Sequence, residues 1–146
     1  LCSMAISRGL KAVPCDTAKA AVDGADIVVT TVTLVPEPAP FLDARWLKAG
    51  SFTTMTDLAL PWLPETMQRF DRIVIDDLEQ ERTLEKPMVR PELVAGDLTG
   101  LVCGDFPGRE NPSETTTFAF RGLAVGDLAI AALAYVRAKA AGAFEG

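Results

Sequence analysis

The chain contains no histidine among its 146 residues. This absence excludes Ser-His-Asp and Cys-His catalysis, imidazole acid–base chemistry and histidine-ligated metals. Cysteine is scarce as well: Cys2, Cys15 and Cys103 lie far apart and form no Cys-x-x-Cys pair. We therefore expect neither a disulfide framework nor a zinc site, and this cysteine usage favours a cytoplasmic protein.

Basic residues and long apolar runs are also few. The 14 Lys and Arg residues are scattered among 20 Asp and Glu residues, which gives a net charge of −6. We expect no nucleic-acid partner and no anionic membrane partner. The longest strongly apolar run, Leu128 to Val136, is about half of a membrane span. With 49% apolar residues and a mean hydropathy of +0.20, the chain is expected to fold as a soluble globular protein.

Glycine-rich phosphate-binding motifs are missing too. The chain has neither Gly-x-Gly-x-x-Gly nor Gly-x-x-x-x-Gly-Lys-[Ser/Thr]. Gly100, Gly104 and Gly108 are spaced by four residues in an expected loop with no helix start behind them, so they do not predict a phosphate cradle. The sequence starts at Leu1, inside a stretch typical of the tail of a helix, and we expect the chain to be part of a longer protein.

What the chain does have is an alternation of short β-branched segments and helical segments. The expected strands are 10–13, 27–32, 51–55, 72–76 and 115–118, with a strand or connector at 99–103. The expected helices are 16–24, capped by Asp16 or Thr17, 41–47, capped by Asp43, 64–70, and a long alanine-rich helix from 122 to about 141. Residues 78–94 are charged and interrupted by prolines. This order predicts an α/β fold with a doubly wound parallel sheet.

Two of these elements carry further expectations. Residues 27–32 are apolar on both faces, which is typical of a strand in the middle of a parallel sheet that helices cover. The small residues of the last helix allow close approach of a partner segment, although an ordinary core helix is an equal alternative.

Polar side chains follow two of the predicted strands, where doubly wound sheets bind their ligands. Thr30, Thr31 and Thr33 offer hydroxyls for ribose or phosphate oxygens, although threonine also simply favours strands. Thr56 and Asp57 close the next strand. A carboxylate at that position can hold a substrate ammonium or move a proton, and the alternative is a turn residue that caps the following helix.

Five segments together resemble the ornithine cyclodeaminase/mu-crystallin family. They are GADIVVTTVT (24–33), DARWLKAG (43–50), TMTD (54–57), GRENPSETTTF (108–118) and GLAVGDLA (122–129). The resemblance covers essentially the whole chain and matches the carboxyl-terminal half of the family's chain. It implies a Rossmann-like NAD(P)-binding sheet that is incomplete, because the upstream strands are absent, and a long C-terminal helix.

The resemblance also implies site residues. Asp57 matches the family aspartate that acts near the substrate's amine or imine carbon. The cofactor-binding residues that it implies are Thr31, Val32, Thr33, Thr56 and Gly122. Phe120-Arg121-Gly122 stands where the family usually has a serine, a small residue and a glycine close to the nicotinamide. After Asp57 the family often has a Pro-Gly turn, whereas this chain continues with Leu-Ala-Leu-Pro.

The resemblance implies NAD(P)-linked hydride transfer at the α-carbon of an amino or imino acid, by a cyclodeaminase or an imine reductase or dehydrogenase. The cofactor would be NAD or NADP in the complete enzyme, the substrate a small amino or imino acid, and the assembly a homo-oligomer. This chain by itself is expected to be inactive. The alternative is a non-catalytic, crystallin-like or truncated chain that serves assembly or ligand binding.

The expected organisation has two parts. Residues 1–112 form a partial Rossmann dinucleotide-binding domain, and residues 113–146 form a return strand and a helix directed toward a dimerisation or substrate domain. If the strand order is 3-2-1-4-5-6, residues 10–13 are strand 3 and residues 27–32 are strand 4, and the two central strands between them are absent.

Overall fold

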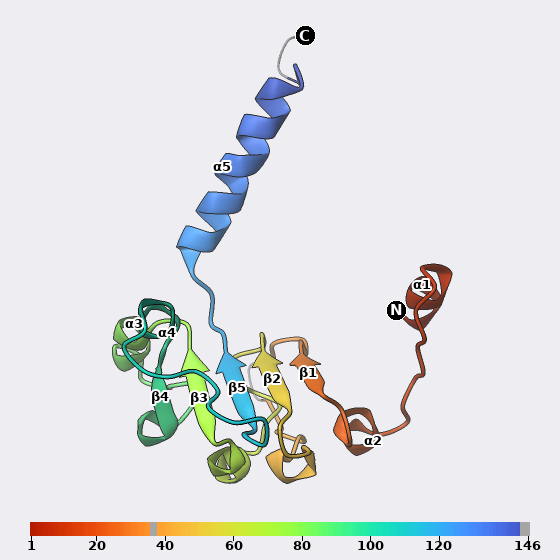
Figure 1. The fold of residues 1–146 in the computed structure, drawn as a ribbon, viewed down its shortest axis with the longest axis vertical. Helices are drawn as coiled ribbons and strands as arrows, with labels where there is room; N and C mark the ends of the chain where they lie inside the picture. The colour runs from red at the N-terminus through yellow and green to blue at the C-terminus, as the bar shows by residue number, and fades with distance from the viewer. Residues whose placement is uncertain (36–37, 144–146) are drawn as a thin grey trace.

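The computed structural model describes residues 1–35 and 38–143, which are built on a five-stranded sheet. The strands are β1 (Ile27–Thr30), β2 (Phe52–Met55), β3 (Arg72–Ile75), β4 (Val94–Asp97) and β5 (Thr116–Ala119). Their order in the sheet is β1-β2-β5-β3-β4, and every neighbouring pair is parallel (Figure 1). The predicted α/β class is confirmed. Because the strands are parallel, their carboxyl ends all lie at one edge of the sheet.

The strand predicted at residues 10–13 is wrong. This segment has no regular structure, and Leu10 and Val13 are exposed. Residues 27–30 do form a strand, but β1 lies at the border of the sheet and pairs only with β2. A strand needs hydrogen-bonding partners as well as β-branched residues, and the described chain offers none on the outer side of β1.

The region around residue 97 also differs from the prediction. A strand, β4, ends at Asp97, and α4 (Leu98–Cys103) replaces the strand or connector expected at 99–103. Asp97 starts this helix, because its Oδ1 accepts a hydrogen bond from the N–H of Gly100 at 2.8 Å. Gly104 ends the helix in the left-handed conformation, with φ +83°.

The other helices mostly follow the expected capping residues. Thr17 caps α2 (Ala18–Val22) and Asp43 caps the 3-10 helix η1 (Ala44–Trp46), as predicted. Asp77 caps α3 (Leu78–Arg82), a helix that was not predicted. The remaining short helices are α1 (Cys2–Ser7), η2 (Pro64–Arg69), also 3-10, and η3 (Pro91–Leu93). The segments expected as helices at 41–47 and 64–70 are therefore helical, but they are tighter and shorter than an α-helix.

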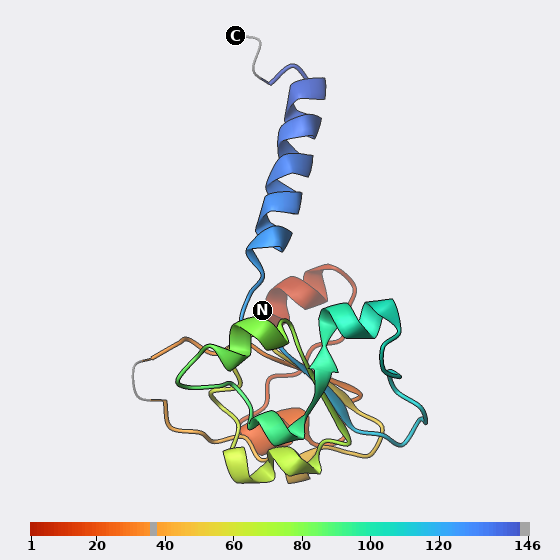
Figure 2. The same cartoon turned by 90° about the vertical axis from the view of Figure 1, so that its left-hand side faces the viewer.

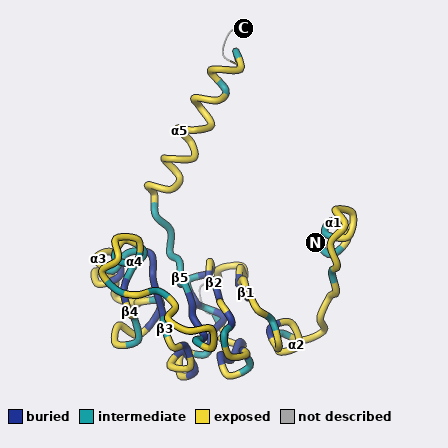
Figure 3. The backbone as a smooth tube through the Cα atoms, in the orientation of Figure 1, coloured by how far each residue is buried: buried dark blue, intermediate teal, exposed yellow. Residues whose placement is uncertain are grey.

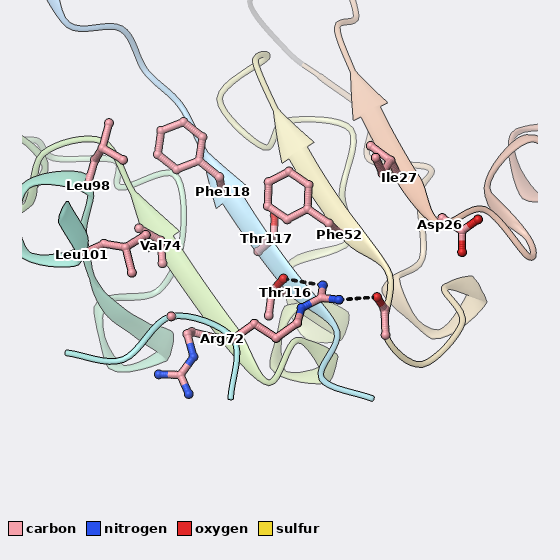
Figure 4. Close-up of a pocket in the computed structure, with 13 residues that line it drawn as sticks. Asp26, Ile27, Phe52, Arg72, Val74, Leu98, Leu101, Thr116, Thr117 and Phe118 are labelled. Atoms are coloured by element: carbon pink, nitrogen blue, oxygen red, sulfur yellow. Dashed lines mark hydrogen bonds between the residues drawn. The ribbon is translucent and has the colours of Figure 1, made fainter. Parts of the chain in front are cut away.

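The two faces of the sheet differ sharply in burial. One face packs against the segment after β2, in which Trp62, Met67 and Phe70 are buried, and this is the hydrophobic core. On the opposite face Ile27 and Val29 are 66% and 60% exposed. A hollow of about 710 Å³ lies over this open face, beside α4 (Figure 4). The expectation of helices on both faces is therefore met only in part within the described residues.

The last helix, α5 (Ala124–Ala140), confirms the prediction of a long alanine-rich helix. It points away from the sheet (Figure 2), and none of its residues is buried (Figure 3). Exposed apolar side chains in this number are typical of an interaction surface. They are Val125, Leu128, Ile130, Leu133 and Val136. Within the described ranges, each helix is too short or too polar to traverse a bilayer.

The expected division at residues 112 and 113 stays a prediction. β5, which follows that point, is the central strand of the sheet, and α5, which follows β5, extends away from it.

Two buried threonine hydroxyls lead to a first prediction. Thr53 and Thr117 are register partners on the core face, and among the described residues neither Oγ1 has a hydrogen-bond partner. We expect Thr53→Val and Thr117→Val each to raise the free energy of unfolding by about 1 kcal/mol, because a buried unpaired hydroxyl is replaced by a methyl of similar shape. Urea denaturation measures the change.

Thr30→Val is the matched control for these variants. Its hydroxyl donates to Asp57, so the same change there should lower the free energy of unfolding. If Thr53→Val and Thr117→Val destabilise the protein as Thr30→Val does, their hydroxyls have partners and the prediction is wrong.

The cap of η1 leads to a prediction about pH. The Arg45 guanidinium, hydrogen-bonded to Asp43, holds the pKa of that carboxyl below its ordinary value. A lowered pKa in the folded state stabilises the protein above the ordinary value of about 3.8, and this contribution disappears as the pH falls through the folded-state pKa. The difference in unfolding free energy between the wild type and Asp43→Asn should therefore be present at pH 6 and shrink below pH 3.8. If the difference stays the same from pH 6 to well below pH 3.8, the prediction is wrong.

Candidate functional site

Aspartates follow three of the strands at the carboxyl edge of the sheet. Asp57 lies two residues beyond β2, Asp76 directly follows β3, and Asp97 ends β4. Each of them accepts hydrogen bonds from backbone N–H groups of a neighbouring segment. These carboxylates therefore fix the backbone positions of the loops that form this edge.

Asp57, the predicted catalytic residue, is 1% exposed. Its Oδ1 accepts a hydrogen bond from Thr30 Oγ1 at 3.1 Å, and its Oδ2 accepts one from the N–H of Val32 at 3.2 Å. Trp62 Nε1 lies 3.4 Å from the same Thr30 hydroxyl and donates to it. Asp57 thus ties the end of β1 to the end of β2, beneath the surface of the edge.

The turn after Asp57 has an uncommon backbone. Leu58 and Ala59 have φ of 60° and 58°, and the N–H of Leu60 donates to the carbonyl of Asp57 at 3.1 Å. Positive φ at both central residues is the geometry of a type I′ turn, which normally uses Asn or Gly. Left-handed residues with a side chain cost about 1–2 kcal/mol each, and such strain is typical of functional sites.

Four of the residues predicted to bind a cofactor lie on the surface of this edge. Thr31, Val32, Thr33 and Thr56 are all exposed. Thr56 Oγ1 donates to the carbonyl of Thr30 at 2.9 Å, and Val32 is held by Asp57. The structure therefore brings Thr31, Val32, Thr56 and Asp57 together, whereas Thr33 lies further along the loop.

Gly122 comes to the same edge from the neighbouring strand. β5 lies beside β2, and the N–H of Phe120 donates to the carbonyl of Met55 at 2.9 Å. Phe120 stands where the sequence resemblance implies a serine, and its ring packs on Phe118, with centroids 5.9 Å apart. Gly122 has φ +122°, a conformation that side-chain-bearing residues rarely adopt.

Sequence reasoning missed the residues that hold Gly122 in place. Asp76 is 2% exposed, and its Oδ2 accepts hydrogen bonds from the N–H groups of Arg121 at 2.9 Å and Gly122 at 2.7 Å. The Arg121 guanidinium pairs with Glu81, which α3 presents from the other side. An aspartate at the end of the predicted strand 72–76 was the signal in the sequence, since Asp57 was selected on nearly the same ground.

A five-stranded parallel sheet with hydroxyls and aspartates at its carboxyl edge defines a Rossmann-like α/β unit. The chain belongs to the ornithine cyclodeaminase/mu-crystallin family, whose model matches residues 2–142.

Relatives and solved structures agree with this assignment. A putative dehydrogenase, RB0419, of Rhizobium meliloti is 33% identical in an alignment of 139 positions that covers 86% of this chain and 40% of that protein. The N-((2S)-2-amino-2-carboxyethyl)-L-glutamate dehydrogenase of Staphylococcus aureus is 29% identical over 85% of this chain and 38% of its own length. An archaeal alanine dehydrogenase dimer with bound NAD has a TM-score of 0.74 and 28% identity over 94% of this chain and 45% of its own. The chain thus spans about 40% of the length of these curated relatives.

The residues of this edge fit one end of a dinucleotide. The exposed residues Thr31 and Thr56 carry hydroxyl groups that suit a ribose. Among the described residues other than its chain neighbours, no atom lies within 4 Å of a Cβ added at Gly122, which leaves room for a ligand there. The pyrophosphate fits poorly. The helices that start at this edge, α3 and α4, are capped by Asp77 and Asp97, whose negative charges oppose a phosphate.

Gly122 and Gly126 form a matched pair for a third prediction. Among the described residues outside the immediate chain neighbourhood, an added Cβ meets no atom within 4 Å at either position, and of the two glycines only Gly122 has a positive φ. We expect Gly122→Ala to lower the free energy of unfolding by about 1–3 kcal/mol through backbone strain alone. Gly126→Ala, inside α5, should raise helicity in circular dichroism and destabilise nothing. Equal stability of Gly122→Ala and the wild type would mean that the loop relaxes freely.

Proposed function

We propose that this chain is the later portion of the dinucleotide-binding domain of an ornithine cyclodeaminase-like enzyme. The reaction is NAD(P)-linked hydride transfer at the α-carbon of a small amino or imino acid, by a cyclodeaminase or an imine reductase or dehydrogenase. The observation that carries the proposal is the buried Asp57, which lies next to exposed hydroxyls at the carboxyl edge of a parallel sheet. The names of the relatives, which are dehydrogenases and a cyclodeaminase, support the same chemistry.

Asp57 is the acid–base or ammonium-binding group of this proposal. Its hydrogen bonds from Thr30 and Val32 use two of the roughly four lone-pair sites of a carboxylate. The remaining sites can accept a substrate ammonium or a proton. Because the side chain is 1% exposed, substrate reaches it only when the residues that cover it move aside.

The cofactor, NAD or NADP, would supply or accept the hydride. Thr31, Val32, Thr33, Thr56 and Gly122 would line its nicotinamide and ribose. The pyrophosphate would be held outside the described residues, so this chain by itself would be inactive.

The organisation and setting of the proposed enzyme follow the sequence analysis. Residues 1–112 would be the partial cofactor domain, and residues 113–146 would lead through α5 to a dimerisation or substrate domain. The enzyme would be a homo-oligomer in the cytoplasm. The exposed apolar side chains of α5 support a further protein contact.

A second candidate is a non-catalytic, crystallin-like chain that serves assembly or ligand binding. Two points favour it: each oxygen of Asp57 already accepts a hydrogen bond from the protein's own groups, and Phe120 stands where the sequence resemblance implies a serine.

Turnover separates the two candidates. The complete protein that contains this chain is assayed with NADH and NADPH against a panel of cyclic and linear imino acids. It is also assayed with NAD and NADP against the corresponding amino acids. The enzyme proposal predicts turnover with at least one pair, and no turnover with any pair would favour the non-catalytic chain.

Asp57→Asn gives the sharper prediction. It keeps the shape of the side chain but removes its charge and its ability to take a proton, so kcat should fall about 10²–10⁴-fold. The affinity for the cofactor should change little. Asp97→Asn, at the end of β4, is the control for general disturbance of the edge and should retain most of the turnover. If Asp57→Asn keeps more than a third of the wild-type kcat, Asp57 is a structural residue.

A further inference from the structure

We propose that Asp76, assisted by Glu81, is a positioning residue that fixes the cofactor-facing backbone at residues 120–122. This inference rests on the proposed function, because it assigns a purpose to the Gly122 loop of that site. It adds two residues that neither the motifs nor the family resemblance singled out.

The geometry around Asp76 carries the proposal. One oxygen, Oδ2, accepts hydrogen bonds from two consecutive peptide N–H groups, those of Arg121 at 2.9 Å and Gly122 at 2.7 Å. The other oxygen accepts the N–H of Asp77 at 3.2 Å. Charge-assisted hydrogen bonds of this kind are about twice as strong as neutral ones, and the carboxylate is 2% exposed. Asp76 therefore holds the peptide planes on both sides of Arg121.

Glu81 holds the same segment through its side chain. Arg121 Nε donates to Glu81 Oε2 at 2.9 Å, and Nη2 donates to Oε1 at 3.1 Å, which is a two-point contact. Glu81 Oε1 also accepts the N–H of Met88, and Arg121 Nη2 donates to the carbonyl of Lys86 at 3.3 Å. Two buried acids, Asp76 directly after β3 and Glu81 in α3, thus hold Arg121 by its backbone N–H and by its guanidinium.

The contacts of Asp76 with residues 121 and 122 have a chemical consequence at the carboxyl edge of the sheet. Because Asp76 takes the N–H groups of residues 121 and 122, those groups are not free to donate to a ligand. The backbone of residues 121 and 122 can therefore offer a nicotinamide its carbonyl oxygens and the space that Gly122 leaves open, but not its N–H groups. The same bonds hold Gly122 at φ +122° and so set the direction in which the chain enters α5.

The test compares Asp76→Asn with Asp97→Asn in the complete enzyme. Both variants neutralise an aspartate that binds backbone N–H groups where a strand ends, but only Asp76 contacts residues 121 and 122. We expect Asp76→Asn to raise the KM for the nicotinamide cofactor at least tenfold, with a smaller change in the KM for the substrate. Asp97→Asn should leave the cofactor KM within threefold of the wild type. Hydrogen exchange at the amides of residues 121 and 122 should speed up in Asp76→Asn alone.

Glu81→Gln provides a milder variant in case Asp76→Asn folds poorly. It keeps a hydrogen-bonding group against Arg121 but removes the charge, so the cofactor KM should rise less than in Asp76→Asn and more than in Asp97→Asn. If the wild type turns over and the cofactor KM of both variants matches that of Asp97→Asn, the positioning role is wrong while the proposed function stands. If the wild type shows no NAD(P)-linked turnover, the proposed function fails, and the cofactor-facing role fails with it.

Discussion

The edge of this sheet depends on hydrogen bonds from backbone N–H groups to buried or half-buried aspartates. Asp57 ties the end of β1 to β2, Asp76 ties the exit of β5 to β3, and Asp97 ties β4 to the start of α3. A loop at the end of a strand has lost its ladder partners, so its N–H groups need other acceptors. A carboxylate supplies two strong ones at once. The positions of Val32, Arg121 and Gly122 follow from these bonds.

Within the described residues, the sheet is fully covered on one face and only partly covered on the other. Its core face carries Trp62, Met67 and Phe70, and the opposite face leaves Ile27 and Val29 exposed beside a hollow. Parallel sheets are normally covered on both faces, since each strand is apolar on both sides. The apolar side chains of α5 are likewise left uncovered by the described residues. These surfaces agree with a chain that spans about 40% of the length of its curated relatives.

The candidate site was predicted from the sequence in part. Asp57 and the nearby threonines follow β-branched runs, so the local sequence predicts that they lie at the carboxyl edge of the sheet. The burial of Asp57 could not be predicted, because it depends on the packing of β2 against other segments, such as β1, whose Thr30 donates to Asp57 and accepts from Trp62. Asp76 was overlooked for a related reason. Its partners, Arg121 and Gly122, are 45 and 46 residues away in the sequence.

The sequence by itself determined the α/β class, four of the five strands and the caps at Thr17 and Asp43, because β propensity and capping are local properties. It misplaced a strand at residues 10–13 and missed β4, because a strand also requires a neighbour to pair with. Only the tertiary structure inserted β5 between β2 and β3. That order brings the exit of β5 against Asp76. The physical reason is that strand order is decided by long-range backbone pairing and by burial, which no short window of the sequence contains.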